Sequence, residues 1–280
     1  MKTANELHRD QVAYWNGVGG GHWVDEQATT DRMLQPVLDA LLAKAAAKPG
    51  ETVLDIGCGN GLSSIELAKQ VAPNGRVVGL DVSGPMVAVA RKRAAGIKNL
   101  EFIAADAVTH PLTPFADLLI SRFGVMFFGD PVAAFSNLRK AMKPTGRLVF
   151  ACWRKFDENP WMQIPLRAAY AHVPRLPQVG PEEPGPFSFA DKERVTRILT
   201  GAGFKTPRFT PVDLSFDIGG GAGLEGAVHQ ATKIGATSRA LQDQPEATVA
   251  AALEAIRAAL SPHVKGSAVV LPGAIWLVEA

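Results

Sequence analysis

Three glycines at alternate positions have the type and spacing of a ligand-binding loop, in the run Asp55-Ile56-Gly57-Cys58-Gly59-Asn60-Gly61. The apolar residues before this run favour a buried strand, and a helix-like pattern follows it. Glycines permit a tight turn and leave the backbone open to a ligand, and the free N–H groups of a helix start attract an anionic group. The spacing G-x-G-x-G brings the third glycine one residue earlier than in dinucleotide-binding enzymes. The run therefore predicts a ligand loop and weakens the interpretation as a nicotinamide oxidoreductase.

Two acidic residues end the next two predicted strands. Asp81 follows the strand 76–80, and Asp106 follows the strand 100–105. A carboxylate at the first position can accept hydrogen bonds from two ribose hydroxyls, and one at the second from the exocyclic amine of adenine. Because the carboxyl ends of parallel strands share the ligand edge of an open sheet, the loop and the two acids predict a nucleoside site there.

Strand and helix patterns alternate through the middle of the chain and must position these residues. Predicted strands cover 52–56, 76–80, 100–105, 116–121 and 146–153, with helices at 62–71, at 83–93 and from Asp130-Pro131 onward. A helix at 191–200 and two late strands at 208–216 and 273–278 complete the pattern. Parallel neighbours need right-handed crossovers, so the alternation predicts an α/β fold with a doubly wound sheet.

Three segments lie outside this predicted core. Residues 1–48 are helical and amphipathic, and we expect them to form an N-terminal cap on a domain spanning 49–280. Residues 154–187 are rich in proline and aromatics, and residues 217–266 hold a glycine run and an alanine-rich helix near 246–260. Inserts at the carboxyl ends of strands often cover the ligand crevice. We therefore expect a helical lid, with dimer contacts or plain packing as the alternatives.

Composition excludes several classes of function. The 280 residues include 29 Lys and Arg against 27 Asp and Glu, a net charge of +2. That charge is too small for binding nucleic acid or an anionic membrane through a basic surface. The two cysteines, Cys58 and Cys152, make neither a disulfide framework nor a zinc motif, so no metal is expected. Without a secretory signal or a long apolar run, the expected location is cytoplasmic.

These motifs resemble those of the class I S-adenosylmethionine-dependent methyltransferases. Residues 53–61 are similar to the first motif of that family, 78–83 to its ribose-binding motif and 105–107 to its adenine-binding motif. The resemblance is close over about 50–153 and is strongest to the small-molecule branch, which includes ubiquinone and menaquinone methyltransferases. Pro144-Thr145-Gly146 stands where the family usually has Pro-Gly-Gly. The resemblance implies a Rossmann-like, seven-stranded, mostly parallel sheet in the order 3-2-1-4-5-7-6.

The resemblance also implies a set of cofactor contacts. The glycines would line the methionine half of S-adenosylmethionine, Asp81 would hold the ribose, and Ser121 to Phe123 would lie beside the sulfonium. From the cap, Trp15 and Trp23 could offer aromatic faces to the cation or simply anchor the cap. Asp55 could instead brace the loop. The expected cofactor-binding residues are Trp15, Asp55, Gly57, Cys58, Gly59, Asn60, Gly61, Asp81, Val82, Met86, Asp106, Ala107, Ser121, Arg122 and Phe123.

The catalytic group is less defined than the cofactor site. His22 in the cap and His172 and His229 in the inserts are weak candidates for a general base, with surface or packing roles as the alternative. Arg122 could pair with an acidic substrate or, as we favour, with Asp130. No residue is assigned as the base from the sequence.

The sequence therefore predicts an S-adenosylmethionine-dependent methyltransferase that produces S-adenosylhomocysteine. Aromatic residues in the inserts, such as Trp161 and Tyr170, predict a small and partly hydrophobic acceptor, methylated at oxygen, nitrogen or carbon by in-line displacement. The alternatives are another use of the cofactor, such as cyclisation or decarboxylation, and a non-catalytic cofactor-binding subunit. A monomer and a homodimer are both compatible with the sequence.

Overall fold

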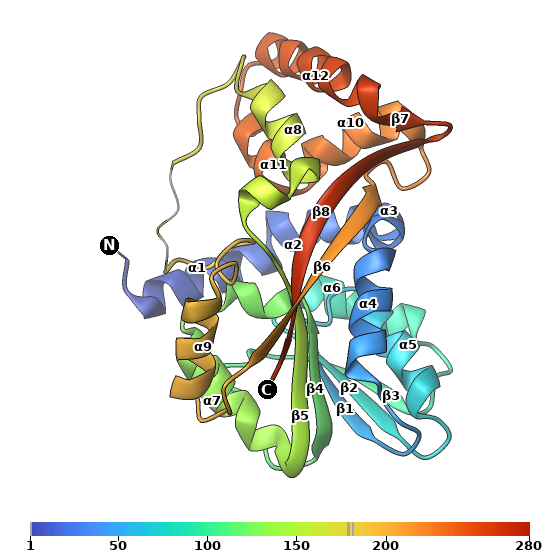
Figure 1. Ribbon diagram of the computed structural model, residues 1–280, viewed down its shortest axis with the longest axis vertical. Coiled ribbons are helices and arrows are strands. Elements are labelled where there is room, and N and C mark those ends of the chain that lie inside the picture. The colour runs from blue at the N-terminus through green and yellow to red at the C-terminus, as the bar shows by residue number, and fades with distance from the viewer. Residues whose placement is uncertain (1, 178–179, 181) are drawn as a thin grey trace.

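The computed structural model describes residues 2–177, 180 and 182–280, arranged around a single mixed sheet (Figure 1). The strand order is β3-β2-β1-β4-β5-β8-β6, so the predicted order is confirmed. The last long strand is the eighth in sequence because a two-residue strand, β7, precedes it and pairs only with it. The strands are β1 (Thr52–Ile56), β2 (Arg76–Asp81), β3 (Leu100–Ala104), β4 (Ala116–Arg122), β5 (Met142–Trp153), β6 (Arg208–Asp217), β7 (Val264–Lys265) and β8 (Ala268–Glu279).

The first five strands are parallel, and β8 runs antiparallel between β5 and β6. Two predicted strands were too short. β5 begins at Met142 because its first residue pairs with Ala116 across a bulge, and β8 begins at Ala268 because it continues as a ribbon with β6. Short patterns mark the buried centre of a strand better than its solvent-exposed ends.

Helices cover both faces of the sheet, with α4 and α5 on one side and α7 and α9 on the other (Figure 1). The predicted caps of α6 and α7 are confirmed, since Ser83 accepts from Met86 N and Asp130 from Ala133 N. Among the described residues, no helix has the length and apolar character needed to cross a bilayer. These helices are α4 (Gln35–Ala45), α5 (Leu62–Val71), α6 (Gly84–Arg93), α7 (Pro131–Ala141) and α9 (Lys192–Gly201).

The predicted cap divides into two parts. Helix α4 contacts β4 and β5 and buries Val37, Leu38 and Leu41, so it belongs to the core of the sheet. Helix α1 has no buried residue and lies over the carboxyl ends of the strands together with its neighbour α2. The three helices before α4 are α1 (Ala4–Asn16), α2 (Val18–Asp25) and α3 (Gln27–Met33).

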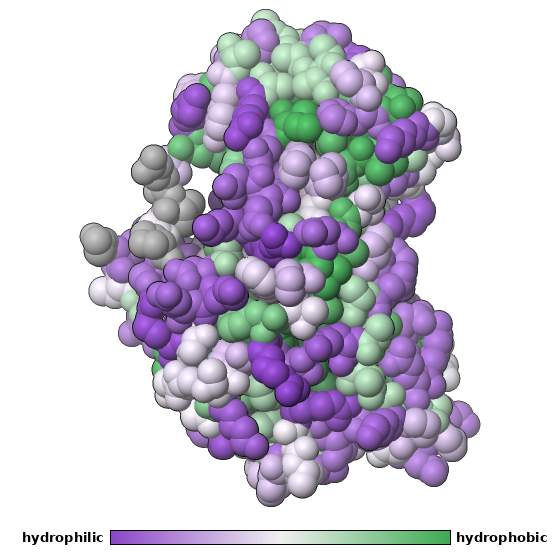
Figure 2. Space-filling model, in the orientation of Figure 1, coloured by the Kyte–Doolittle hydropathy of each residue, from purple (hydrophilic) through white to green (hydrophobic). Residues whose placement is uncertain are grey.

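The two predicted inserts come together as one helical layer. Helix α8 contacts α11 and α12, and α10 contacts both of those helices, although α8 is far from the other three in sequence. The layer sits on the ribbon of β6 and β8, at the top of Figure 1, and the alanine-rich α12 gives it a pale green surface in Figure 2. Its elements are η2 (Phe156–Glu158), α8 (Pro160–Ala169), α10 (Gly223–Lys233), α11 (Gly235–Leu241), α12 (Glu246–Leu260) and η3 (Ser261–His263).

Gly61, directly before helix α5, packs closely against helix α6 and strand β3. Its φ is +87°, in the left-handed region that favours glycine. A Cβ atom there would lie 2.8 Å from the ring of Phe102 and 2.9 Å from the Cβ of Ala90. The third glycine of the loop is therefore required by close contact within the fold.

Replacing Gly61 with alanine should lower the free energy of unfolding by roughly 2–4 kcal/mol, the sum of left-handed strain and overpacking. Gly96→Ala is the matched control, because Gly96 has φ +90° but nothing within 4 Å of the added Cβ. It should lose only the strain component, about 1–2 kcal/mol. Urea denaturation of both variants measures the difference, and equal losses would contradict the packing role of Gly61.

Asp55 is a fully buried acid behind the glycine loop. Its Oδ2 accepts hydrogen bonds from the hydroxyls of Ser63 and Ser64, both at 2.6 Å, and so ties β1 to the start of α5. Burial raises the pKa of Asp55 from 3.8 to about 6, because the charged form loses hydration that the two hydroxyls replace only in part.

Between pH 4 and pH 6, the folded chain should hold a proton on Asp55 that the unfolded chain has released. The free energy of unfolding should therefore fall as pH rises through this window, by about 3 kcal/mol relative to Asp55→Asn. Urea unfolding of wild type and variant at several pH values measures this difference. Asp213→Asn, at an exposed carboxylate, is the control, and a wild-type-minus-Asp55→Asn difference independent of pH would refute the assignment.

Candidate functional site

The glycine loop is fixed to the next strand by a carboxylate. Asp81, at the end of β2, accepts from Gly59 N through Oδ2 and from Ser83 N through Oδ1, both at 2.8 Å. Burial raises the pKa of Asp81, while these backbone N–H donors favour its charged form. Gly59 has φ +54°, and a Cβ there would meet nothing closer than Met86 Sδ at 3.9 Å. The loop thus presents bare backbone to open space.

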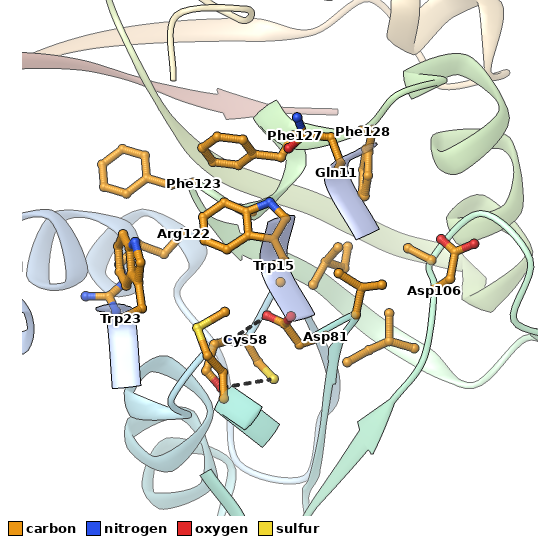
Figure 3. A pocket seen from close by; sticks show the side chains of 18 of the residues that line it. Gln11, Trp15, Trp23, Cys58, Asp81, Asp106, Arg122, Phe123, Phe127 and Phe128 are labelled. Carbon is orange, nitrogen blue, oxygen red and sulfur yellow. Dashed lines mark hydrogen bonds between the residues drawn. The ribbon is translucent and has the colours of Figure 1, made fainter. Parts of the chain in front are cut away.

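That open space is a pocket of about 1000 Å³, including its mouth, at the carboxyl ends of the central strands (Figure 3). Trp15 lies above Asp81, with Arg122 and Trp23 on one side and Asp106 on the other. The pocket brings together twelve of the expected cofactor residues: Trp15, Gly57, Cys58, Gly59, Asn60, Asp81, Val82, Met86, Asp106, Ala107, Arg122 and Phe123.

Three expected residues lie outside the lining of this pocket. Asp55 is behind the loop and braces it, as the alternative interpretation held, and Gly61 faces the ring of Phe102. Ser121 is fully buried, because successive strand residues point to opposite faces and its neighbour Arg122 takes the side of the pocket.

Helix α1 contributes a face that the sequence analysis did not assign to the site. His8, Gln11, Val12 and Trp15 all line the pocket, and their spacing of three and four places them on one side of the helix. His8 Nε2 lies 3.1 Å from Asp106 Oδ2, and Asn16 Nδ2 donates to the carbonyl of Val82 at 3.0 Å. The helix is therefore attached near both ends, and its spacing was a signal present in the sequence.

Arg122 does not pair with Asp130, contrary to the sequence expectation. Asp130 caps α7, whereas Arg122 Nη2 lies 3.9 Å from Oδ1 of Asp31 on α3. The other oxygen of Asp31 accepts from Arg93 at 2.7 Å. Burial lowers the pKa of Arg122, and its Nη1 has no hydrogen-bond partner in the described part of the chain. A buried cation with an unused N–H edge is suited to an anion.

The three histidine candidates lie away from the pocket. His172 is exposed beyond α8, and exposed His229 lies 2.8 Å from Glu26 Oε1, while His22 on α2 does not line the pocket. None of the described residues of 154–187 or 217–266 lines it either. The helices of these inserts therefore do not form the expected lid over the pocket. They pack together in a separate layer on the ribbon of β6 and β8.

Trp23 and eleven further residues complete the lining of the pocket. Several are apolar or aromatic and come from η1 (Gly124–Phe127) and its neighbour Phe128, directly after β4. Sequence patterns do not identify the residues of η1 and Phe128, because their positions depend on how this loop returns over the sheet. The eleven residues are His8, Gln11, Val12, Asp31, Ile56, Ser63, Leu80, Ala105, Gly124, Phe127 and Phe128.

Solved structures with this fold include S-adenosylmethionine-bound phosphoethanolamine N-methyltransferase 2 of Haemonchus contortus. It matches with a TM-score of 0.57 at 16% identity, over 100% of this chain and 60% of that one. A putative methyltransferase of Bacillus halodurans matches with a TM-score of 0.52 at 18% identity, over 86% and 96% of the two chains. Both likenesses concern the fold.

Sequence relatives give the same family. An uncharacterized 37.1 kDa protein in transposon TN4556 of Streptomyces fradiae is 32% identical over 198 residues, 69% of this chain and 54% of that protein. A demethylmenaquinone methyltransferase of Corynebacterium kroppenstedtii is 28% identical over 193 residues, 63% of this chain and 80% of that protein. The chain spans about half the length of several curated relatives. A family model described as "Methyltransferase domain" matches residues 47–203, more than half of the chain. The chain therefore belongs to the S-adenosylmethionine-dependent methyltransferase family.

Proposed function

We propose that this protein transfers the methyl group of S-adenosylmethionine to a small, partly hydrophobic molecule. One observation carries the proposal: the bare loop at Gly59, the carboxylates of Asp81 and Asp106 and the buried Arg122 all face a single pocket. Each has chemistry that matches a different part of the cofactor, as the following paragraphs argue. When bound, the cofactor supplies an electrophilic methyl group on a sulfonium.

Asp81 and Asp106 suit the nucleoside half of the cofactor. Each oxygen of Asp81 accepts one backbone N–H, which leaves lone pairs for the two ribose hydroxyls. Val82 and Met86, which follow Asp81 in the chain, and Ala107, which follows Asp106, offer apolar side chains to the same pocket. An adenine ring placed against them would direct its exocyclic amine toward Asp106.

Asp31 and Arg122 suit the amino-acid half of the cofactor. Arg122 lies on the opposite side of Trp15 from Asp106, in the direction of Trp23 (Figure 3), and its Nη2 is 3.9 Å from Oδ1 of Asp31. A carboxylate can take the unused Nη1 of Arg122, and an ammonium group can take an oxygen of Asp31. Opposite charges in one buried place fit a zwitterion better than a simple anion.

The aromatic residues of the pocket favour an acceptor with apolar character. The ring of Trp15 packs edge to face on those of Phe127 and Trp23, with centroid distances of 4.9 Å and 6.4 Å. The faces of these rings can attract a sulfonium and exclude water. The remaining task of the protein is to align the acceptor atom with the methyl group. Relatives named demethylmenaquinone methyltransferase and aklanonic acid methyltransferase support a small acceptor for this chain.

Asp81→Ala should weaken the binding of S-adenosylhomocysteine, the expected product, by at least about tenfold, since two hydrogen bonds to a charged group are lost. Calorimetric titration measures this affinity. Asp213→Ala is the matched control on an exposed strand position and should bind as wild type does. Wild type that binds neither sulfur cofactor, or an Asp81→Ala variant that binds equally well, would refute the proposal.

Arg122→Met should distinguish the two halves of the cofactor. It should lower the affinity for S-adenosylhomocysteine by at least about tenfold, because a charge-assisted hydrogen bond is lost. The affinity for 5′-methylthioadenosine, which has no amino-acid group, should stay unchanged. Calorimetry with the two ligands tests this assignment, and a parallel loss for both would contradict it.

A further inference from the structure

A second cavity lies inside the helical layer formed by the two inserts. It has about 410 Å³ of empty space, including its mouth, between α8, α10, α11 and the end of α3. Its walls are mainly apolar, with Met33, Met162, Ile218 and Ile234 among them, and no charged side chain of the described residues lines it. A charged ligand would find no counter-ion there, so the cavity suits a neutral molecule.

Two residues that line the cavity each hold a buried polar atom with no hydrogen-bond partner among the described residues: Nε1 of Trp161 and Oε1 of Gln230. Gln230 is only 5% exposed, and its amide nitrogen donates to Thr30 Oγ1 at 3.4 Å. One unused atom is a donor and the other an acceptor. Native proteins seldom leave such buried groups unpaired, so each calls for a partner.

We propose that this cavity binds a neutral, largely apolar molecule that carries a hydroxyl group, such as a phenol. A hydroxyl is both a donor and an acceptor. It can donate to Oε1 of Gln230 and accept from the indole N–H of Trp161, while the ring contacts the methionine and isoleucine side chains. A hydroxyl is therefore the single functional group whose chemistry matches both unpaired atoms.

The second cavity is separate from the cofactor pocket. Asp31 lines the pocket and Met33 lines the cavity, so helix α3 forms part of the partition. Phe123, which lines the pocket, stacks on Trp153 with ring centroids 4.2 Å apart. The centroid of Trp153 is 5.1 Å from that of Trp161, which lines the cavity, so these three rings form another part of the partition. No residue in the described part of the chain lines both spaces, so ligand binding in the cavity can be tested without reference to methyl transfer.

The indole N–H signal of Trp161 in a ¹H–¹⁵N spectrum of the full chain reports on the cavity directly. Trp161→Phe assigns the signal by removing it. Titration with 4-ethylphenol should shift it to saturation at millimolar concentration, and ethylbenzene, which lacks the hydroxyl, should bind at least about tenfold more weakly. A signal that 4-ethylphenol does not move would show that the cavity holds water only and would overturn the proposal.

Variants on α10 separate the hydroxyl contact from the apolar one. Gln230→Leu should weaken 4-ethylphenol about tenfold and leave ethylbenzene unchanged, whereas Ala231→Phe should fill the cavity and exclude both. Thr232→Ala, on the same helix but outside the cavity, is the matched control. Equal affinity of wild type and Gln230→Leu for the phenol would overturn the assignment. Thermal unfolding and unchanged S-adenosylhomocysteine affinity confirm that each variant is folded.

Discussion

The carboxylate of Asp81 joins the three elements that shape the cofactor pocket. One oxygen holds the glycine loop through Gly59 N, and the other holds the start of α6 through Ser83 N. The hydroxyl of Ser83 then donates to the carbonyl of Trp15 on α1 at 2.7 Å. Hydrogen bonds to a buried, charged acceptor are strong because little water competes. The position of the loop, and of the helix above it, therefore depends on this one side chain.

Helix α1 is held by polar contacts and by the ring of Trp15, which packs on Phe127 and Trp23. None of its residues is buried, and its attachments run through His8, Trp15 and Asn16. An element with few buried contacts opens at a lower free energy than the sheet beneath it. Such a helix can admit a ligand of nucleoside size while the core of the protein stays folded.

The long ribbon of β6 and β8 explains why the chain has two cavities. The pairs between Asp213–Asp217 and Val270–Ala274 extend past the pairing of β8 with β5, and this part of the ribbon contacts the helical layer that the two inserts form. Helix α3 and the stacked rings of Phe123 and Trp153 lie between that layer and the cofactor pocket. The inserts consequently enclose a space of their own, with its own unpaired polar atoms.

The sequence alone determined the central strands, the glycine loop and the two acids at the strand ends, because local apolar runs and turn residues encode them and parallel strands bring their carboxyl ends to one edge. The strand order followed only from the resemblance of these motifs to a known family. The α1 face was also encoded locally, in the spacing of His8 to Trp15. Only the tertiary structure decided that Arg122 faces Asp31, that the described residues of the inserts do not line the pocket, and that Trp161 and Gln230 line one cavity. These contacts join segments far apart in the chain, and packing between such segments has no periodic signal in the sequence.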